Sequence, residues 1–263
     1  MRVFTFLVHF LIFTFLTILT QVGGILWVVA LIIRHFWKLK LRYVFVIIYL
    51  VANFLFVPII AKKFGRVPLP RTKTENIIPV NFWYPLFFRN YTSIELNQTL
   101  KNISKEFNSK YKIQIVYLDA CFPFIKGFPL LPHLSHNDGD KIDLSFIYTD
   151  KNGQLTTKKR SYTGYGIFEE PNSKEVQMTE LCKRKGFRQY DFTKYLTGPK
   201  NTTVEFNRMA TRDLIISILK QQSVKKVFIE PHLINQLSID SNKLKFHGCQ
   251  AVRHDDHIHL QLN

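Results

Sequence analysis

The sequence predicts an α+β domain that follows two transmembrane helices. Two long apolar runs near the N-terminus predict the membrane helices. Downstream, short β-branched segments alternate with amphipathic ones, and one pair of segments flanks a tight turn. A mixed order of strands and helices with an antiparallel hairpin is typical of the α+β class. We therefore expect a membrane anchor at 1–66, a linker at 67–92 and a folded domain at 93–263.

The first apolar run, residues 3–33, contains no Lys, Arg, Asp or Glu. A bilayer core of about 30 Å needs about 20 helical residues, so this run is long enough to span and must tilt, bend near Gly23-Gly24 or enter the interface. The second run, residues 43–61, fits one span. A cleaved signal peptide has a shorter apolar core and a small-residue cleavage site, which this segment lacks. The alternative is a buried helical hairpin of a soluble protein.

Charge does not decide the orientation of this anchor. The short basic loop "RHFWKLKLR" (34–42) favours the cytoplasm, and two spans would then place both termini outside. The segment "KKFGRVPLPRTK" that follows the second run is also basic and argues for the opposite orientation.

Beyond the anchor, each element has its own signal. Prolines at 64–87 predict an extended linker. A helical period starts at Ser93 and predicts one buried face, made of Leu96, Leu100, Ile103 and Phe107. Residues 112–122 are β-branched and aromatic and predict a strand, and "DKNG" within 141–162 predicts a hairpin turn.

The last hundred residues hold one more helix and two strands. Residues 205–222 predict a helix with one apolar side, made of Met209, Leu214, Ile215 and Ile218. Segments 225–231 and 257–262 predict short strands. The three cysteines, Cys121, Cys182 and Cys249, are too scattered for a metal cluster, and one disulfide would form in an oxidising compartment.

Two groups of histidine and aspartate carry the chemistry. His257 and His259 lie two apart on the last predicted strand and point to the same face. Asp143 opens another predicted strand, and His136 precedes it across the loop "NDGD". If these two strands lie side by side, His136, Asp143 and His259 surround one point, with His257 next to it.

Three nitrogen and oxygen ligands with one open position are typical of a catalytic zinc site. Zinc lowers the pKa of its bound water to near 7. His257, which is not needed as a ligand, would then transfer a proton or stabilise an oxyanion.

The stretches "PHLSHNDGDKIDLSF" and "VRHDDHIHLQL" resemble the penicillin-insensitive murein endopeptidases, within the group that includes lysostaphin-type enzymes, D-alanyl-D-alanine carboxypeptidases and the hedgehog signalling domain. The shared pattern is His, six residues, Asp, then a late His-x-His. The resemblance covers about residues 112–263 and implies a small antiparallel sheet with flanking helices that carries a zinc site.

The resemblance also implies roles for individual residues. The implied zinc ligands are His136, Asp143 and His259, and the implied catalytic histidine is His257. His133 and His254 would line the site or bind substrate. Asp256 lies three residues before His259, where some relatives carry a carboxylate base, so His257 and Asp256 both remain candidates for the main base. Glu230 is a candidate to orient a ligand histidine.

The chain departs from the family pattern in two respects. Asp138 and Asp140 stand in a loop that usually contains Ser-Gly, and we expect them to alter the polarity of the pocket or to bind a basic group. Relatives are usually secreted, whereas this chain is anchored. His35, His232 and His247 have no partner at ligand spacing, and we expect them at the surface or at helix caps. His9 lies in an apolar run, and we assign it no role.

The expected function is hydrolysis of peptidoglycan peptide bonds that contain D-amino acids, by a zinc metallopeptidase. The domain would face the periplasm or cell exterior from the cytoplasmic membrane, held in lipid by residues 1–66. These residues hold eight of the 36 Lys and Arg and none of the 19 Asp and Glu. No nucleic-acid-binding motif accompanies this charge, so we expect no nucleic-acid partner. The alternatives are a zinc-containing, non-hydrolytic binding module and a membrane structural protein.

Overall fold

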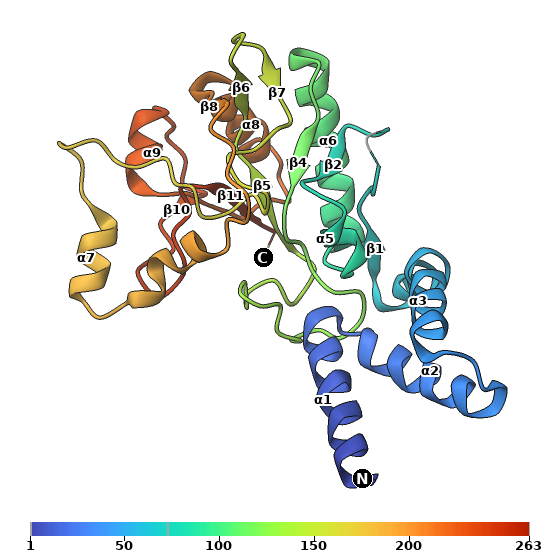
Figure 1. Cartoon of the computed structure of the whole chain (residues 1–263). Helices are drawn as coiled ribbons and strands as arrows, with labels where there is room; N and C mark the ends of the chain where they lie inside the picture. The colour runs from blue at the N-terminus through green and yellow to red at the C-terminus, as the bar shows by residue number, and fades with distance from the viewer. Residues whose placement is uncertain (1, 73, 263) are drawn as a thin grey trace.

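The computed structural model describes residues 2–72 and 74–262. Its centre is a six-stranded sheet in the order β10-β9-β11-β5-β4-β2 (Figure 1). The strands are β2 (Ile77–Pro79), β4 (Ile115–Tyr117), β5 (Lys141–Ser145), β9 (Lys226–Phe228), β10 (Leu244–Lys245) and β11 (His257–Gln261).

Two smaller sheets flank the central one. The first pairs β1 (Arg66–Pro68) with β3 (Tyr91–Ser93), and the second has the order β7-β6-β8, from β6 (Tyr148–Asp150), β7 (Leu155–Thr156) and β8 (Val204–Phe206). The hairpin predicted at "DKNG" is present between β6 and β7. However, the chain leaves the central sheet after β5, so β5 and β6 belong to different sheets.

The mixed α/β class is confirmed, but the expectation of one small antiparallel sheet is wrong. In the central sheet β11 pairs antiparallel with both β5 and β9, whereas β2 runs parallel to β4 and β10 runs parallel to β9. Each parallel pair is joined by a connection that contains a helix, α6 (Ile94–Tyr111) or α9 (Pro231–Gln236). Such a crossover returns the chain to the same end of the sheet, which makes the pairing parallel.

Two helices bury the back of the central sheet. In α6, Ser93 caps the N-terminus by accepting the N–H of Leu96 at 3.2 Å. Its predicted apolar face is buried in one core with α8 (Arg208–Leu219) and with the sheet residues Ile258 and Leu260. The predicted face of α8 is correct except for Met209, which is 73% exposed at the first turn.

Alternation along β11 decides where polar residues lie. Ile258 and Leu260 join the core against α6 and α8. Because neighbouring residues of a strand point to opposite faces, His257 and His259 project from the face without these helices. That face is covered by loops and by the 3₁₀ helix η3 (Arg188–Tyr195), which the short helix α7 (Met178–Arg184) precedes.

Three apolar helices form the N-terminal part. They are α1 (Arg2–Thr20), α2 (Gly23–Trp37) and a continuous helix at 41–64, composed of α3 (Leu41–Val51), the π-helical turn η1 (Ala52–Phe56), α4 (Val57–Ala61) and the 3₁₀ turn η2 (Lys62–Phe64). Two of them, Val3–Thr20 and Leu41–Phe64, are long and apolar enough to cross a membrane, whereas α2 is shorter.

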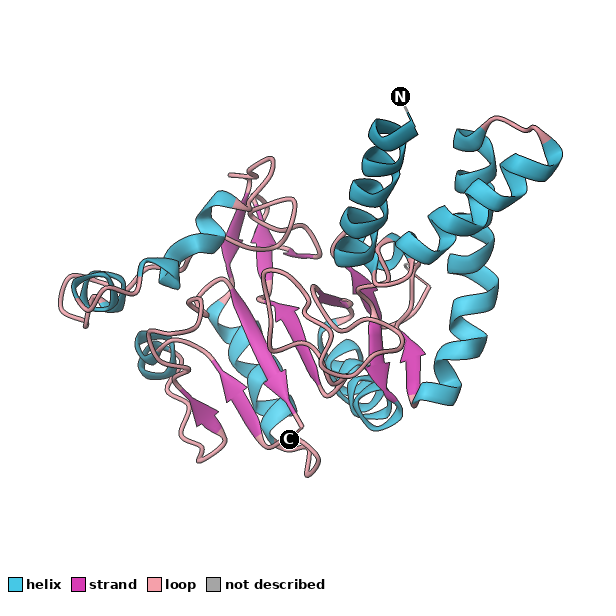
Figure 2. Ribbon diagram, turned by 90° about the horizontal axis from the view of Figure 1, so that it is seen from below, coloured by secondary structure: helices cyan, strands magenta, loops and turns pink. Residues whose placement is uncertain are grey.

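The first apolar run bends at the predicted glycines. Gln21 has a positive φ of 64°, and the N–H of Gly23 donates to Thr20 Oγ1 at 2.7 Å. A side chain at position 24 would place its Cβ 2.0 Å from Thr17 Oγ1, so Gly24 lets α2 pack closely on α1. The N-terminal end of α1 and the connection between α2 and α3 therefore both lie away from the sheet (Figures 1 and 2). The structure differs here from the expectation of two spans, which had placed the N-terminus on the same side of the membrane as the domain.

The segment 67–92 is part of the folded domain and not the extended linker that its prolines suggested. It supplies β2 to the central sheet and the helix α5 (Trp83–Leu86). The amide of Asn53, in the π-helical turn, donates to the carbonyls of Pro85 and Leu86 at 3.1 and 2.9 Å. Arg71 in turn donates to the Asn53 carbonyl at 2.8 Å. The helix at 41–64 is therefore fixed to the domain.

Candidate metal centre

Pairing of β5 with β11 brings the two sequence motifs together. The register sets His259 opposite Asp143 and His257 opposite Ser145, on one face of the sheet. Directly opposed side chains of an antiparallel pair lie about 5 Å apart at Cβ, so short contacts between them are expected. Nδ1 of His259 lies 2.9 Å from Oδ1 of Asp143.

The loop before β5 supplies the remaining histidines. His136 and His133 lie in one tight turn, closed by the His136 N–H donating to the His133 carbonyl at 3.0 Å. The Nδ1–H of His136 donates to the carbonyl of Ala120 at 2.9 Å, so its Nε2 is left to face Asp143. A carbonyl partner of this kind fixes the ring and tautomer of many metal-binding histidines.

Three donor atoms form a small triangle. His136 Nε2 lies 3.2 Å from Asp143 Oδ1 and 3.1 Å from His259 Nδ1, and the third side is the 2.9 Å contact between Asp143 and His259. All three residues are buried. Tetrahedral ligands at about 2.0–2.2 Å from a zinc ion lie about 3.3–3.6 Å from one another, so these atoms would need to move apart by only a few tenths of an ångström. The donor types and their spacing therefore fit such an ion.

His133 belongs to the same cluster but contacts the other oxygen of Asp143. Ligand atoms of His133, His136 and Asp143 all lie within 4.8 Å of one another, so this buried group could hold a metal ion. However, His133 Nδ1 lies 2.7 Å from Asp143 Oδ2, which also accepts the hydroxyl of Tyr165 at 2.8 Å. The two oxygens thus differ: Oδ1 faces His136 and His259, and Oδ2 is held by His133 and Tyr165.

His257 lies beside the triangle and is backed by Asp256. Its Nε2 is 3.6 Å from Asp143 Oδ1, and its Nδ1 contacts Asp256 Oδ1. The other oxygen of Asp256 accepts the backbone N–H of Gly166 at 2.6 Å. Asp256 is buried and both of its oxygens are engaged, so it faces His257 and not the triangle.

No family model and no curated protein matches this chain. The resemblance to murein endopeptidases therefore rests on two motifs alone, "PHLSHNDGDKIDLSF" and "VRHDDHIHLQL".

Electrostatic effects separate the histidines of the site. Burial lowers the pKa of His259 to about 4, which keeps its ring neutral and a nitrogen lone pair free. For His257 burial also lowers the pKa, but Asp143 and Asp256 outweigh it and raise the pKa to about 9. Burial would raise the pKa of Asp143, yet His136, His257 and His133 hold it well below its usual range. The carboxylate and His259 are therefore both in the protonation states that metal ligands require.

A pocket of about 360 Å³ opens over these residues. One wall is the loop at 132–136, and the other comes from the segment 247–254 and from η3. His254, predicted to line the site, does so, and its ring centroid is 4.9 Å from that of His257. His247, to which the sequence assigned no role, lines the same wall, 5.5 Å from the ring of His254.

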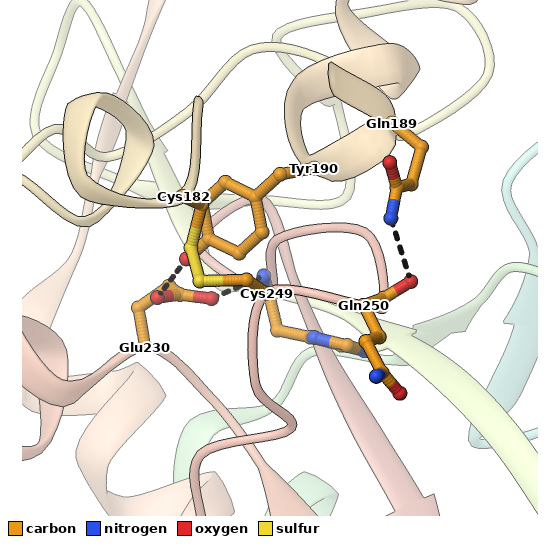
Figure 3. Close-up of a disulfide and its surroundings, with 7 residues drawn as sticks. Cys182, Gln189, Tyr190, Glu230, Cys249 and Gln250 are labelled. Atoms are coloured by element: carbon orange, nitrogen blue, oxygen red, sulfur yellow. Dashed lines mark hydrogen bonds between the residues drawn. A yellow bond between two sulfur atoms is a disulfide. The ribbon is translucent and has the colours of Figure 1, made fainter. Parts of the chain in front are cut away.

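A disulfide ties the 247–254 segment of the second wall to α7, the helix that precedes η3. Cys182 in α7 is bonded to Cys249, at a sequence separation of 67 residues. Close by, the Gln189 amide donates to the Gln250 carbonyl at 3.3 Å (Figure 3). The disulfide and this hydrogen bond hold η3, with Gln189 and Phe192, over the pocket. Nothing in the local sequence pattern pointed to Gln189 or Phe192, because loop packing places them there.

Glu230 does not orient a ligand histidine, contrary to our expectation. Its carboxylate accepts the hydroxyl of Tyr190 at 2.6 Å and the backbone N–H of His254 at 3.0 Å (Figure 3). It therefore supports the segment that bears His254 and not a ring. His232 is also buried and not at the surface, and its Nε2–H donates to the Glu169 carbonyl at 2.7 Å.

Two expectations for the loop acids fail in the same way. Asp138 pairs with Lys141 and accepts the Asp140 N–H at 3.0 Å. Among the described residues, those that line the pocket include neither acid. A third acid, Asp119, was missed: it holds Arg89 by contacts of 2.5 and 2.7 Å and lies 3.7 Å from His133. Its position just after β4 was the available signal.

Proposed function

We propose that this protein is a membrane-anchored zinc metallopeptidase that hydrolyses peptide bonds of peptidoglycan. The observation that carries the proposal is the buried triangle of His136 Nε2, Asp143 Oδ1 and His259 Nδ1, with sides of 2.9–3.2 Å and with His257 beside it. Incidental histidines of a structural protein would not be expected to converge on one buried carboxylate.

Each residue has a distinct part in this proposal. His136, Asp143 and His259 would hold the zinc ion, which supplies a Lewis acid and a water with a pKa near 7. His133 and Tyr165 hold the second oxygen of Asp143 and thereby fix its direction. These contacts form the outer shell that metal sites need to keep ligands in place.

His257 is the proposed acid and base. Asp256 holds its Nδ1, so Nε2 is the nitrogen directed to the site. The charge of a bound zinc ion would lower the His257 pKa from about 9, so that Nε2 could accept a proton from the attacking water and return it to the leaving amine. The geometry favours His257 over Asp256 as the base, because the His257 ring lies between the Asp256 carboxylate and the triangle. A module that only binds needs no such pair, which favours hydrolysis over the non-hydrolytic alternative.

The substrate and its location are inferred from three features. The motif resemblance points to D-amino-acid-containing peptides of the cell wall. The Cys182–Cys249 disulfide is typical of a compartment outside the cytoplasm. Because the N-terminal end of α1 and the 34–42 loop lie at the end remote from the domain, an external domain would leave their basic residues in the cytoplasm, as the positive-inside rule favours.

Two measurements on the full-length protein in detergent test this function. We expect about one zinc ion per chain, with most of it lost in His136→Ala and kept in the control His35→Ala, whose ring is exposed in the membrane anchor. Digestion of isolated sacculi, followed by mass analysis, should release muropeptides with a cleaved stem or crosslink. Stoichiometric zinc without any cleavage would leave the binding module as the function, and a protein without zinc would refute both.

A further inference from the structure

An apolar groove lies where the membrane helices meet the domain. Its volume is about 570 Å³, and its walls come from α2, from the helix at 41–64 and from the domain residues Phe124 and Ile125. Except for Gln21, all of its lining residues are apolar. Two of its walls belong to helices long or apolar enough for lipid, so the groove is continuous with the hydrocarbon that would surround them.

The domain wall of this groove is the beginning of the loop that carries the metal site. Gln21, at the bend between α1 and α2, accepts the backbone N–H of Phe124 at 2.9 Å and that of Ile125 at 3.3 Å. Phe122 and Leu130 of the same loop are buried in one cluster with helix residues that include Val22 and Val57. The loop then continues directly to His133 and His136 (Figure 1).

Exposed apolar side chains lie at both ends of the loop that connects the groove with the metal pocket. Ile125 is 56% exposed and Leu134 is also 56% exposed, and Leu134 lines the metal pocket itself. Exposed apolar side chains that gather on one loop are typical of an interaction site. The loop thus presents apolar surface at both of its ends, one in the groove and one at the mouth of the pocket.

Positive charge borders the same groove. Lys62 and Lys63 are exposed at the domain end of the helix, next to the groove residue Phe64, and Lys126 is exposed next to Ile125. No Asp or Glu occurs in residues 1–66 to neutralise the two helix lysines. This end of the groove therefore suits a phosphate group at the level of the membrane surface.

We propose that the groove holds the apolar tail of a lipid-phosphate-linked peptide and that the peptide reaches the metal pocket along the loop 124–134. This inference rests on the proposed hydrolysis and specifies its substrate: a cell-wall peptide still attached to its lipid carrier. The fixed attachment of the second membrane helix, through Asn53 and Arg71, supports it, because the pocket cannot move far from the membrane.

Binding of two probes tests the inference without relying on turnover. The full-length protein is placed in discs of neutral phosphatidylcholine and titrated with one fluorescent stem peptide, either free or joined through a diphosphate to a prenyl chain. We expect the tailed probe to bind at least tenfold more tightly. Ile125→Ser should remove about tenfold of that affinity, because one buried apolar contact is lost. Lys62→Gln with Lys63→Gln should weaken the tailed probe alone.

Ile94→Ser is the matched control, because Ile94 is 61% exposed on α6, outside the groove. It should bind the tailed probe as the parent does, which corrects for partition of the tail into the disc lipid. Equal affinity of the parent for both probes, or equal binding of the tailed probe by Ile125→Ser and Ile94→Ser, would overturn the inference. Tail-dependent binding with no cleavage of either probe would instead refute only the proposed hydrolysis.

Discussion

Replacing Asp256 with Asn tests the assignment of the base most directly. One carboxylate oxygen contacts His257 Nδ1 and the other accepts the Gly166 N–H at 2.6 Å, so both neighbours present N–H donors. Asn offers one acceptor oxygen and one NH₂ group. If the oxygen stays on Gly166, the NH₂ faces His257 and favours the tautomer with its proton on Nε2, which cannot accept a proton from water.

The expected cost follows from that change of tautomer. Loss of a positioned general base lowers kcat by about 10² to 10⁴-fold, which corresponds to about 3–5 kcal/mol in the activation barrier. Zinc should remain bound, because Asp256 contacts none of the three donor atoms of the triangle. His257→Ala should show the same loss of kcat and also retain zinc. The measurements are zinc content, melting temperature and kcat on a purified muropeptide, with exposed Asp240→Asn as the matched control.

Three results would refute the reasoning. Full turnover by both Asp256→Asn and His257→Ala would show that neither residue takes part in the chemistry. Loss of zinc in His257→Ala would make His257 a ligand and would require a new role for His259. A greater loss of kcat in Asp256→Ala than in His257→Ala would make the carboxylate the base.

Four further outcomes follow from the structure. His259→Ala should lose most of the zinc, as atomic absorption would measure; full retention would contradict the ligand assignment. Burial lowers the pKa of Lys159 to about 7, so the folded state binds fewer protons than the unfolded state between pH 7 and 10 and stability rises with pH by up to about 1.4 kcal/mol per unit. Lys159→Met should abolish this slope in thermal unfolding. Cys182→Ser with Cys249→Ser should cost about 2–5 kcal/mol of stability and raise KM while zinc stays bound; an unchanged KM would show that the pocket wall does not depend on the disulfide. In intact cells, an impermeant thiol label should react with a cysteine added at the C-terminus of the protein and not with one added at its N-terminus.

Local patterns in the sequence predicted the elements that carry the site. The period of α6 and the alternation of "HIHLQL" depend only on side chains that are close in the chain, so both could be read directly. The opposition of Asp143 and His259 required only that two predicted strands be neighbours. The length of the uncharged apolar runs predicted helices at the N-terminus, although the first run forms two helices, α1 and α2.

The parts that were missed depend on contacts distant in the sequence. Asp119 and Tyr165 lie 46 residues apart and meet through a hydrogen bond of 3.4 Å, which no local pattern announces. The prolines of 67–92 indicated extended chain, but only pairing with β4 makes β2 part of the sheet. The predicted role of Glu230 was wrong because this residue, which follows β9, lies beside the backbone of His254 and not beside a ligand histidine ring.

Under the proposed function, the disulfide between Cys182 and Cys249 also bears on when the metal pocket would become active. This bond ties one segment of the pocket wall to the helix that precedes the other segment, and thiols of the cytoplasm are kept reduced. A chain newly made in the cytoplasm would therefore carry its histidines on an incompletely assembled pocket. Translocation and oxidation would complete the wall only on the far side of the membrane. Under the proposed function, the redox difference between two compartments would thus restrict proteolysis to the far side of the membrane.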